Sequence, residues 1–168
     1  MMKLKRRSFF ASLSLTVPAL MSGCLSDGTD RYETEGNDDD LIEVDAVELA
    51  IESHQIEGDG WEIVREEDYG VSFTRHFSRG EGHIGNSIDV YESVDEAKES
   101  LEWEKEALER QDLLWGEHKI GSEGYFFENL GPTVVVRDAN VVGSVISLSG
   151  EDEDLVFSTA VEMHEAWR

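Results

Sequence analysis

Two histidines and one glutamate are spaced so that together they could bind a metal ion. His76 and His83 lie seven positions apart around a glycine-containing connection, and Glu81 lies between them. A strand–turn–strand segment can bring three such side chains within reach of a zinc ion. The alternation of residues before the connection places His76 on the polar side of its strand, however, which favours a solvated histidine. We therefore expect no metal site here.

Other patterns that could indicate catalysis are weaker still. Residues 80–85, GEGHIG, match GxGxxG by their letters, but a strand follows them instead of the required helix, and Glu81 would repel a phosphate. The sequence has no GxSxG motif, and no spacing selects a Ser–His–Asp set. The acidic residues are so numerous that no pair of them indicates glycoside hydrolysis. We expect no catalytic residues and no bound cofactor.

The charge of the chain restricts the partners that it can have. Of its 168 residues 38 are acidic and 14 are basic, so the formal net charge is -24. Nucleic-acid binding depends on Lys and Arg that neutralise phosphates, and docking on anionic lipid depends on the same residues. The composition therefore argues against both. Because molar salt screens such self-repulsion almost completely, the composition favours a protein that works at high salt.

The first 23 residues have the layout of a secretory signal peptide. Their charged residues are all basic, an apolar run covers residues 9–21, and small residues precede Cys24. The apolar run is too short to span a bilayer, which takes about 20 residues. We expect residues 1–23 to be removed, and we exclude them from the fold.

Two details refine this signal. Arg6 and Arg7, followed by Ser-Phe-Phe, look like a twin-arginine export signal. Residues 20–24, LMSGC, resemble a lipobox, in which the cysteine is lipidated and becomes the mature N-terminus, although Met21 stands where leucine is usual. Cys24 is the only cysteine in the chain, so an intramolecular disulfide is excluded.

Together with the acidic mature chain, these motifs resemble those of small surface lipoproteins of halophilic archaea. The resemblance covers residues 1–40 specifically and the rest of the chain only in composition. It implies that the protein is exported folded and is held on the outer face of the cell membrane by lipid attached to Cys24. It implies a location and not an activity.

Residues 24–40 are predicted to form an acidic, disordered tether. Residues 25–40 contain seven acids, one base and almost no apolar side chains. Such a segment cannot bury enough apolar surface to offset the entropy that it loses on ordering. Because its charges repel one another, the tether is expected to hold the following domain, residues 41–168, away from the lipid.

Residues 41–168 predict one α+β domain, with a single, mostly antiparallel sheet of about six strands and about three helices packed on one face of it. Helices are indicated by apolar residues at helical spacing, and Ser93 with Glu96 forms the pattern of a capping box. Strands are indicated by alternation and by β-branched runs. The predicted elements are helix 41–53, strands 61–64, 69–77 and 84–91, helix 93–110, strands 118–128, 134–136 and 141–148, and helix 154–167, with a turn at 65–68.

Since no catalytic pattern occurs, we expect a lipid-anchored extracytoplasmic binding or interaction module, whose partner is a surface protein or a small ligand. The alternative is a solute-binding lipoprotein that uses the sheet face as a pocket, and the third option is a small surface hydrolase or metal-dependent enzyme. Trp115 precedes Gly116 in an apparent loop, so it is the candidate for an exposed contact residue. Trp103 and Trp167 lie at or near the apolar faces of their helices, and we expect them to pack in the core.

Overall fold

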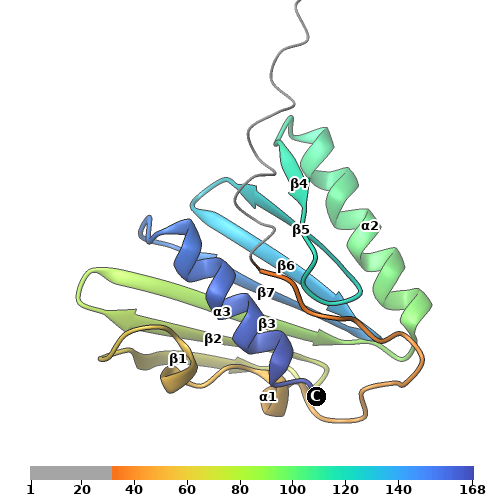
Figure 1. The fold of residues 1–168 in the computed structure, drawn as a ribbon, viewed down its shortest axis with the longest axis horizontal. Coiled ribbons are helices and arrows are strands. Elements are labelled where there is room, and N and C mark those ends of the chain that lie inside the picture. Colours follow the sequence, from red (N-terminus) through yellow and green to blue (C-terminus); the bar gives the residue numbers. More distant parts are fainter. Residues whose placement is uncertain (1–31) are drawn as a thin grey trace, which may run out of the picture.

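Seven antiparallel strands form one continuous sheet in the structure, a computed structural model that describes residues 32–168 (Figure 1). The order of the strands across the sheet is β1-β2-β3-β7-β6-β5-β4. The predicted α+β class with a single antiparallel sheet is confirmed, and the sheet has one strand more than the six expected, the short β4. The strands are β1 Glu62–Asp68, β2 Ser72–Arg79, β3 Gly82–Val90, β4 Trp115–Glu117, β5 Glu123–Glu128, β6 Pro132–Asp138 and β7 Val141–Ser147.

Two meanders make up this sheet. Strands β1, β2 and β3 follow one another at one edge, and the chain then crosses through α2 (Val94–Arg110) to the opposite edge. From there β4 to β7 return toward the middle, where β7 pairs with β3. The centre of the sheet therefore joins strands that are far apart in the sequence.

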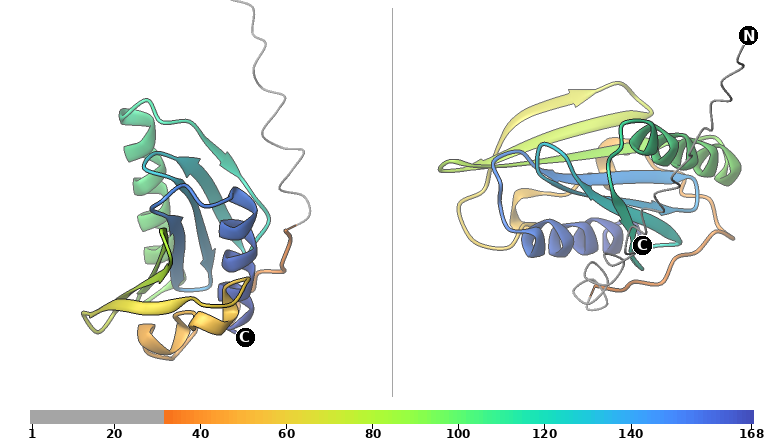
Figure 2. Two further views of the ribbon diagram at one scale, coloured as in Figure 1. Left: turned by 90° about the vertical axis from the view of Figure 1, so that its left-hand side faces the viewer. Right: turned by 90° about the horizontal axis from the view of Figure 1, so that it is seen from above.

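The helices cover both faces of the sheet, which differs from the expected packing on one face. α2 lies on one face, while α3 (Glu153–Glu165) and the short α1 (Ala46–Leu49) lie on the other (Figure 2). A single 3-10 turn, η2 (Ser53–Gln55), follows α1. α2 begins at the predicted N-cap, because the side chain of Ser93 accepts a hydrogen bond from the Glu96 N–H.

The valine run in β6 shows why both faces need a cover. Val134 and Val136 belong to the core under α3, and Val135 between them belongs to the core under α2, since side chains alternate along a strand. All three are buried, so this part of β6 is apolar on both faces of the sheet. α3 contributes Phe157 to the larger of the two cores, and α2 contributes Leu101 to the smaller one.

The first helix is much shorter than the predicted 41–53. Backbone groups that would extend it form hydrogen bonds with buried asparagine side chains instead. Asn140 binds both the N–H and the carbonyl oxygen of Ile42, and Asn86 accepts from the N–H of Ile51. Tertiary hydrogen bonds thus satisfy the backbone where the helix was expected to do so.

The first hairpin turns later than predicted. Residues 65–68, the expected turn, are the second half of β1 and pair with β2. The chain reverses around Gly70, whose φ of +81° is easily reached only by glycine. Tyr69 and Val71 flank this turn and are exposed, although their alternation with the strand that follows predicted a packed face.

Only the second half of the predicted strand 118–128 forms, as β5, because residues 118–122 make a loop. Gly121 in this loop has a φ of +74°, and a Cβ there would lie 2.7 Å from the carbonyl oxygen of Arg137. Only glycine fits at this position, so Gly121 allows the loop to pass close to the backbone of β6. The last hairpin and helix agree with the prediction, with a two-residue turn at 139–140 and with Asp152 as the N-cap of α3.

Residues 32–42, which we call the N-terminal segment, lie against the domain, although the sequence predicts a disordered tether up to Asp40. The ring of Tyr32 stacks on Phe157 of α3, with 5.4 Å between the ring centroids. Asp38 forms an ion pair with a buried arginine of β6. The acids that favoured disorder in the sequence thus include one that finds a buried basic partner in the fold.

Candidate functional site

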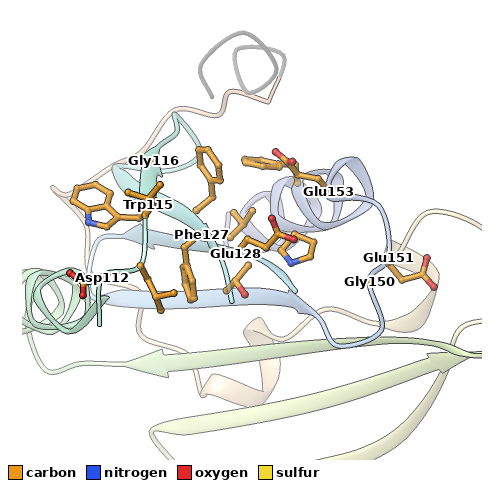
Figure 3. A pocket seen from close by; sticks show the side chains of 15 residues that line it. Asp112, Trp115, Gly116, Phe127, Glu128, Gly150, Glu151 and Glu153 are labelled. Atoms are coloured by element: carbon orange, nitrogen blue, oxygen red, sulfur yellow. The ribbon is translucent and has the colours of Figure 1, made fainter. Parts of the chain in front are cut away.

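A mainly apolar cavity of about 510 Å³ lies at the end of the sheet where β5 turns into β6 (Figure 3). Cavities that hold small molecules have volumes of about 300–1,000 Å³. Its walls come from the loop after α2, from β4, β5 and β6, and from the start of α3 with the loop before it. We call it the aromatic cavity, and it is lined by Asp112, Leu113, Leu114, Trp115, Gly116, Phe126, Phe127, Glu128, Pro132, Thr133, Val134, Gly150, Glu151, Glu153 and Phe157.

Four aromatic rings contribute to its walls. Trp115 and Phe127 are paired across β4 and β5, and Phe126 points to the opposite face of the sheet. Phe157 of α3 meets Phe126 edge-on, with 5.5 Å between the ring centroids. Leu114 is 82% exposed and extends the apolar lining toward solvent. A bound molecule with an apolar body would cover this surface.

The charged groups that line the aromatic cavity are all carboxylates. Asp112 follows α2, Glu128 ends β5, and Glu153 lies in the first turn of α3. The side chain of Glu151 points away from the cavity (Figure 3). Within residues 32–168, none of these four carboxylates forms an ion pair with Lys or Arg. The negative charge of Asp112, Glu128 and Glu153 is therefore available to a ligand.

Trp115 is half-buried in β4 and not in a loop as predicted. Its ring packs edge-on against Tyr125, with 6.1 Å between the centroids, and the ammonium group of Lys105 lies 5.5 Å from its centroid. Trp103 on α2 is 64% exposed, although its position near the apolar face predicted core packing. Trp115 thus belongs to a cavity wall, and Trp103 is the exposed tryptophan.

The two histidines of the metal hypothesis lie on one face of the sheet. β2 and β3 pair Ser78 with His83, so the side chains of His76 and His83 share the face opposite to the larger core. Within residues 32–168, no group of three His, Cys, Asp or Glu side chains is arranged to hold a metal ion. The structure therefore adds no third ligand to this pair.

A second constellation, between α3 and the sheet, has the residue types of a catalytic triad. The Nε2 atom of His164 lies 2.8 Å from a carboxylate oxygen of Asp138. The hydroxyl of Thr34 lies 2.8 Å from Nδ1 of the same ring. Spacing could not select these residues, because Asp138 and Thr34 lie 26 and 130 positions from the histidine.

The surroundings of Thr34 favour a structural role over nucleophilic catalysis. Its hydroxyl oxygen already accepts a hydrogen bond from the Gly121 N–H at 2.9 Å, and the neighbouring Ser122 N–H donates to the Arg137 carbonyl. Acyl transfer needs N–H donors that are free to bind the developing oxyanion. Because both of these donors are engaged, we interpret the set as a hydrogen-bond network that holds the N-terminal segment against the domain.

Asp138 is the central acceptor of this hydrogen-bond network. Besides His164, its carboxylate accepts from the Asn37 N–H at 2.6 Å, the Ser122 hydroxyl at 2.8 Å and the Arg168 guanidinium at 2.8 Å. Burial alone would raise the pKa of Asp138, but the hydrogen bonds from His164, Arg168 and the others together hold it below its usual range. One buried carboxylate thus joins the N-terminal segment, β6 and the C-terminal end of the chain.

Arg137, the preceding residue of β6, depends on the same segment. Its side chain is 2% exposed and forms two hydrogen bonds with Asp38, of 2.7 and 3.2 Å. Glu123 lies farther away, at 3.4 Å. The bonds from Arg137 hold the pKa of Asp38 below its usual range. The N-terminal segment therefore supplies the nearest counter-charge of a buried guanidinium.

The residues of the predicted export signal and anchor lie outside the described part of the chain. These are Arg6, Arg7 and Cys24, together with the rest of the predicted signal peptide, residues 1–23. Export and lipidation therefore stay predictions. Among residues 32–168, no helix is both long and apolar enough to cross a bilayer.

The chain matches no protein-family model, and comparison with curated proteins and with solved structures found no similar protein. An α+β sheet with helices on both faces is compatible with many activities, so a function has to be argued from the site and not from the fold. Two features of the described residues bear on function, the aromatic cavity and the hydrogen-bond network that holds the N-terminal segment against the domain.

Proposed function

We propose that this protein is a lipid-anchored binding module on the outer face of the cell membrane, working at high salt, which catalyses no reaction and binds a small ligand in the aromatic cavity. The observation that carries the binding proposal is the cavity of about 510 Å³ with its mainly apolar walls. Size and lining are those of small-molecule sites. The anchor rests on the motifs around Cys24, and the salt adaptation on the net charge of -24.

A surface protein is the second candidate for the partner. Trp103 stands 64% exposed on α2, and Trp is enriched where proteins contact one another. The face of α2 that carries Trp103 is separate from the aromatic cavity, which Trp103 does not line. A bound small molecule and a bound surface protein would each remain with the protein during purification. One purification experiment therefore distinguishes the two candidates.

Purification from host membranes at high salt, followed by mass spectrometry, tests the anchor and the partner together. We expect the N-terminal peptide to begin at a lipidated Cys24 and a small molecule to be retained by the protein. A protein that co-purifies in stoichiometric amount, with no small molecule, would favour the Trp103 surface instead. An unmodified Cys24 in a soluble fraction would contradict the anchor.

Replacing Leu114 by alanine should weaken binding of an apolar ligand about tenfold. Leu114 lines the aromatic cavity and is 82% exposed, so truncation removes a contact with the ligand and leaves the core intact. A leucine side chain that a ligand covers in part contributes about 1–2 kcal/mol to binding, and 1.4 kcal/mol corresponds to a tenfold change in Kd. The measurement is a fluorescence titration with N-phenyl-1-naphthylamine, an uncharged apolar dye that brightens when it leaves water.

Leu130→Ala is the matched control for this variant. Leu130 is 78% exposed and is not among the lining residues, so the same truncation should leave the Kd of the dye unchanged. If both variants bind the dye as the wild type does, or if the two lose the same affinity, the dye does not occupy the aromatic cavity and the proposed site is wrong.

A further inference from the structure

The charges around the aromatic cavity discriminate between ligands. Asp112, Glu128 and Glu153 contribute carboxylates, and no Lys, Arg or His is among the lining residues. Lys105 lies over the ring of Trp115 but is already engaged by two other carboxylates, at 3.0 and 2.7 Å. An anionic ligand would meet only like charges in the lining, whereas a cation would be attracted to them.

Two of these acids lie at the ends of secondary-structure elements. Glu153 lies in the first turn of α3, where the helix dipole stabilises a negative charge. Glu128 is exposed at the end of β5. Glu151 turns away from the cavity and its carboxylate lies against Gly82, so it does not face a bound ligand.

The aromatic rings add a second, independent preference for positive charge. The face of an aromatic ring carries negative potential, and a cation within about 6 Å of its centroid is attracted to it. Trp115 already takes part in such a contact, since the Lys105 ammonium lies 5.5 Å from its centroid. Phe126, Phe127 and Phe157 offer further rings to an apolar body that carries a charge.

On the basis of the proposed binding function, we infer that the ligand of the aromatic cavity is an organic cation, a quaternary or substituted ammonium group on an aromatic or branched apolar body. The apolar body lies against the apolar side chains that line the cavity, Leu114 among them, and the charged group lies toward Glu128 and Glu153. Such a ligand uses the rings and the carboxylates at once, which neither an anion nor an inorganic cation does.

Displacement of N-phenyl-1-naphthylamine by three compounds with one shared body tests this inference. These are (2-naphthylmethyl)trimethylammonium, its uncharged analogue with carbon in place of nitrogen, and 2-naphthylmethanesulfonate. We expect the ammonium compound to bind at least about tenfold more tightly than the sulfonate. The double variant Glu128→Gln/Glu153→Gln should bind the ammonium compound about fivefold more weakly and the uncharged analogue unchanged.

A second double variant, Glu99→Gln/Glu165→Gln, removes the same charge from exposed positions away from the cavity. It should leave all three affinities unchanged. If it weakens the ammonium compound as much as the cavity variant does, only the net charge matters and the inference is overturned. A sulfonate that binds as tightly as the ammonium compound overturns it too, while dye binding that depends on Leu114 still supports the cavity as the site. Loss of that dependence would contradict the proposed function itself.

Discussion

The Asp38→Ala variant should unfold with a free energy about 3 kcal/mol below that of the wild type. Asp38 is the nearest counter-charge of Arg137, whose side chain is 2% exposed, and removing one partner of a buried ion pair leaves the other charge uncompensated. We place the effect at the lower end of the usual range because Glu123 and the Ala139 carbonyl oxygen remain at 3.4 and 3.1 Å. The measurement is urea-induced unfolding at constant molar potassium chloride.

Two further variants show whether the loss comes from this pair. Asp39→Ala removes the adjacent, exposed carboxylate and should change stability by less than about 0.5 kcal/mol. Adding Arg137→Met to Asp38→Ala should recover much of the loss, because the unpaired charge then disappears. Equal stability of the Asp38→Ala and Asp39→Ala proteins would contradict the packed N-terminal segment, as would the absence of any recovery.

A packed N-terminal segment also changes the expected position of the domain relative to the membrane. Tyr32 stacks on Phe157, which itself lines the aromatic cavity. With lipid on Cys24, the chain between Cys24 and Tyr32 can span at most about 28 Å when fully extended. A lipid on Cys24 would therefore keep Tyr32, and the domain against which it packs, within that distance of the attachment point.

Stability should fall by about 3 kcal/mol as the pH is lowered from about 6.5 to about 4, because of His118. Burial lowers the pKa of His118 from its ordinary 6.5 to about 4. Its Nδ1 atom accepts from the Ile120 N–H and its Nε2 atom bonds to the Val135 carbonyl oxygen, an arrangement that fits the neutral ring. In the unfolded chain His118 therefore binds a proton near pH 6.5, whereas in the folded chain it binds one only near pH 4.

The pH range of this dependence, and not its sign, separates His118 from the paired acids. Asp38 and Asp138 have lowered pKa values, so their contribution is present above their unfolded pKa near 4 and is lost as the pH falls below it. His118→Gln should flatten the decline between pH 6.5 and 4.5, whereas His54→Gln, at an exposed site, should keep it. A slope that survives His118→Gln would assign the pH dependence to other groups.

Much of the secondary structure follows from local pattern. The capping signal at Ser93, the apolar spacing of α2 and α3 and the valine run of β6 predict elements that the structure contains. The largest errors occur where distant polar side chains take over backbone hydrogen bonds, as Asn140 does at Ile42. Local periodicity carries no information about such partners, so the helix predicted over 41–53 is too long.

The candidate site was less accessible to sequence reasoning than the fold. The aromatic residues at 125–127 predict a strand. The pattern does not predict that Phe126 and Phe127 line one cavity together with Phe157 and the loop after α2. The assignment of Trp115 to a loop failed because β4 has only three residues. A run this short gives no reliable alternation.

The sequence by itself determined the α+β class, the acidity that favours high salt, and the motifs around Arg6, Arg7 and Cys24 that predict export and a lipid anchor. Each of these is a local or compositional property of the chain. Only the tertiary structure decided that helices cover both faces, that the acidic N-terminal segment packs on Arg137 and Asp138, and that four rings and three carboxylates meet in one cavity. These features depend on contacts between residues far apart in the chain, which the strand order of the sheet creates and no local spacing encodes.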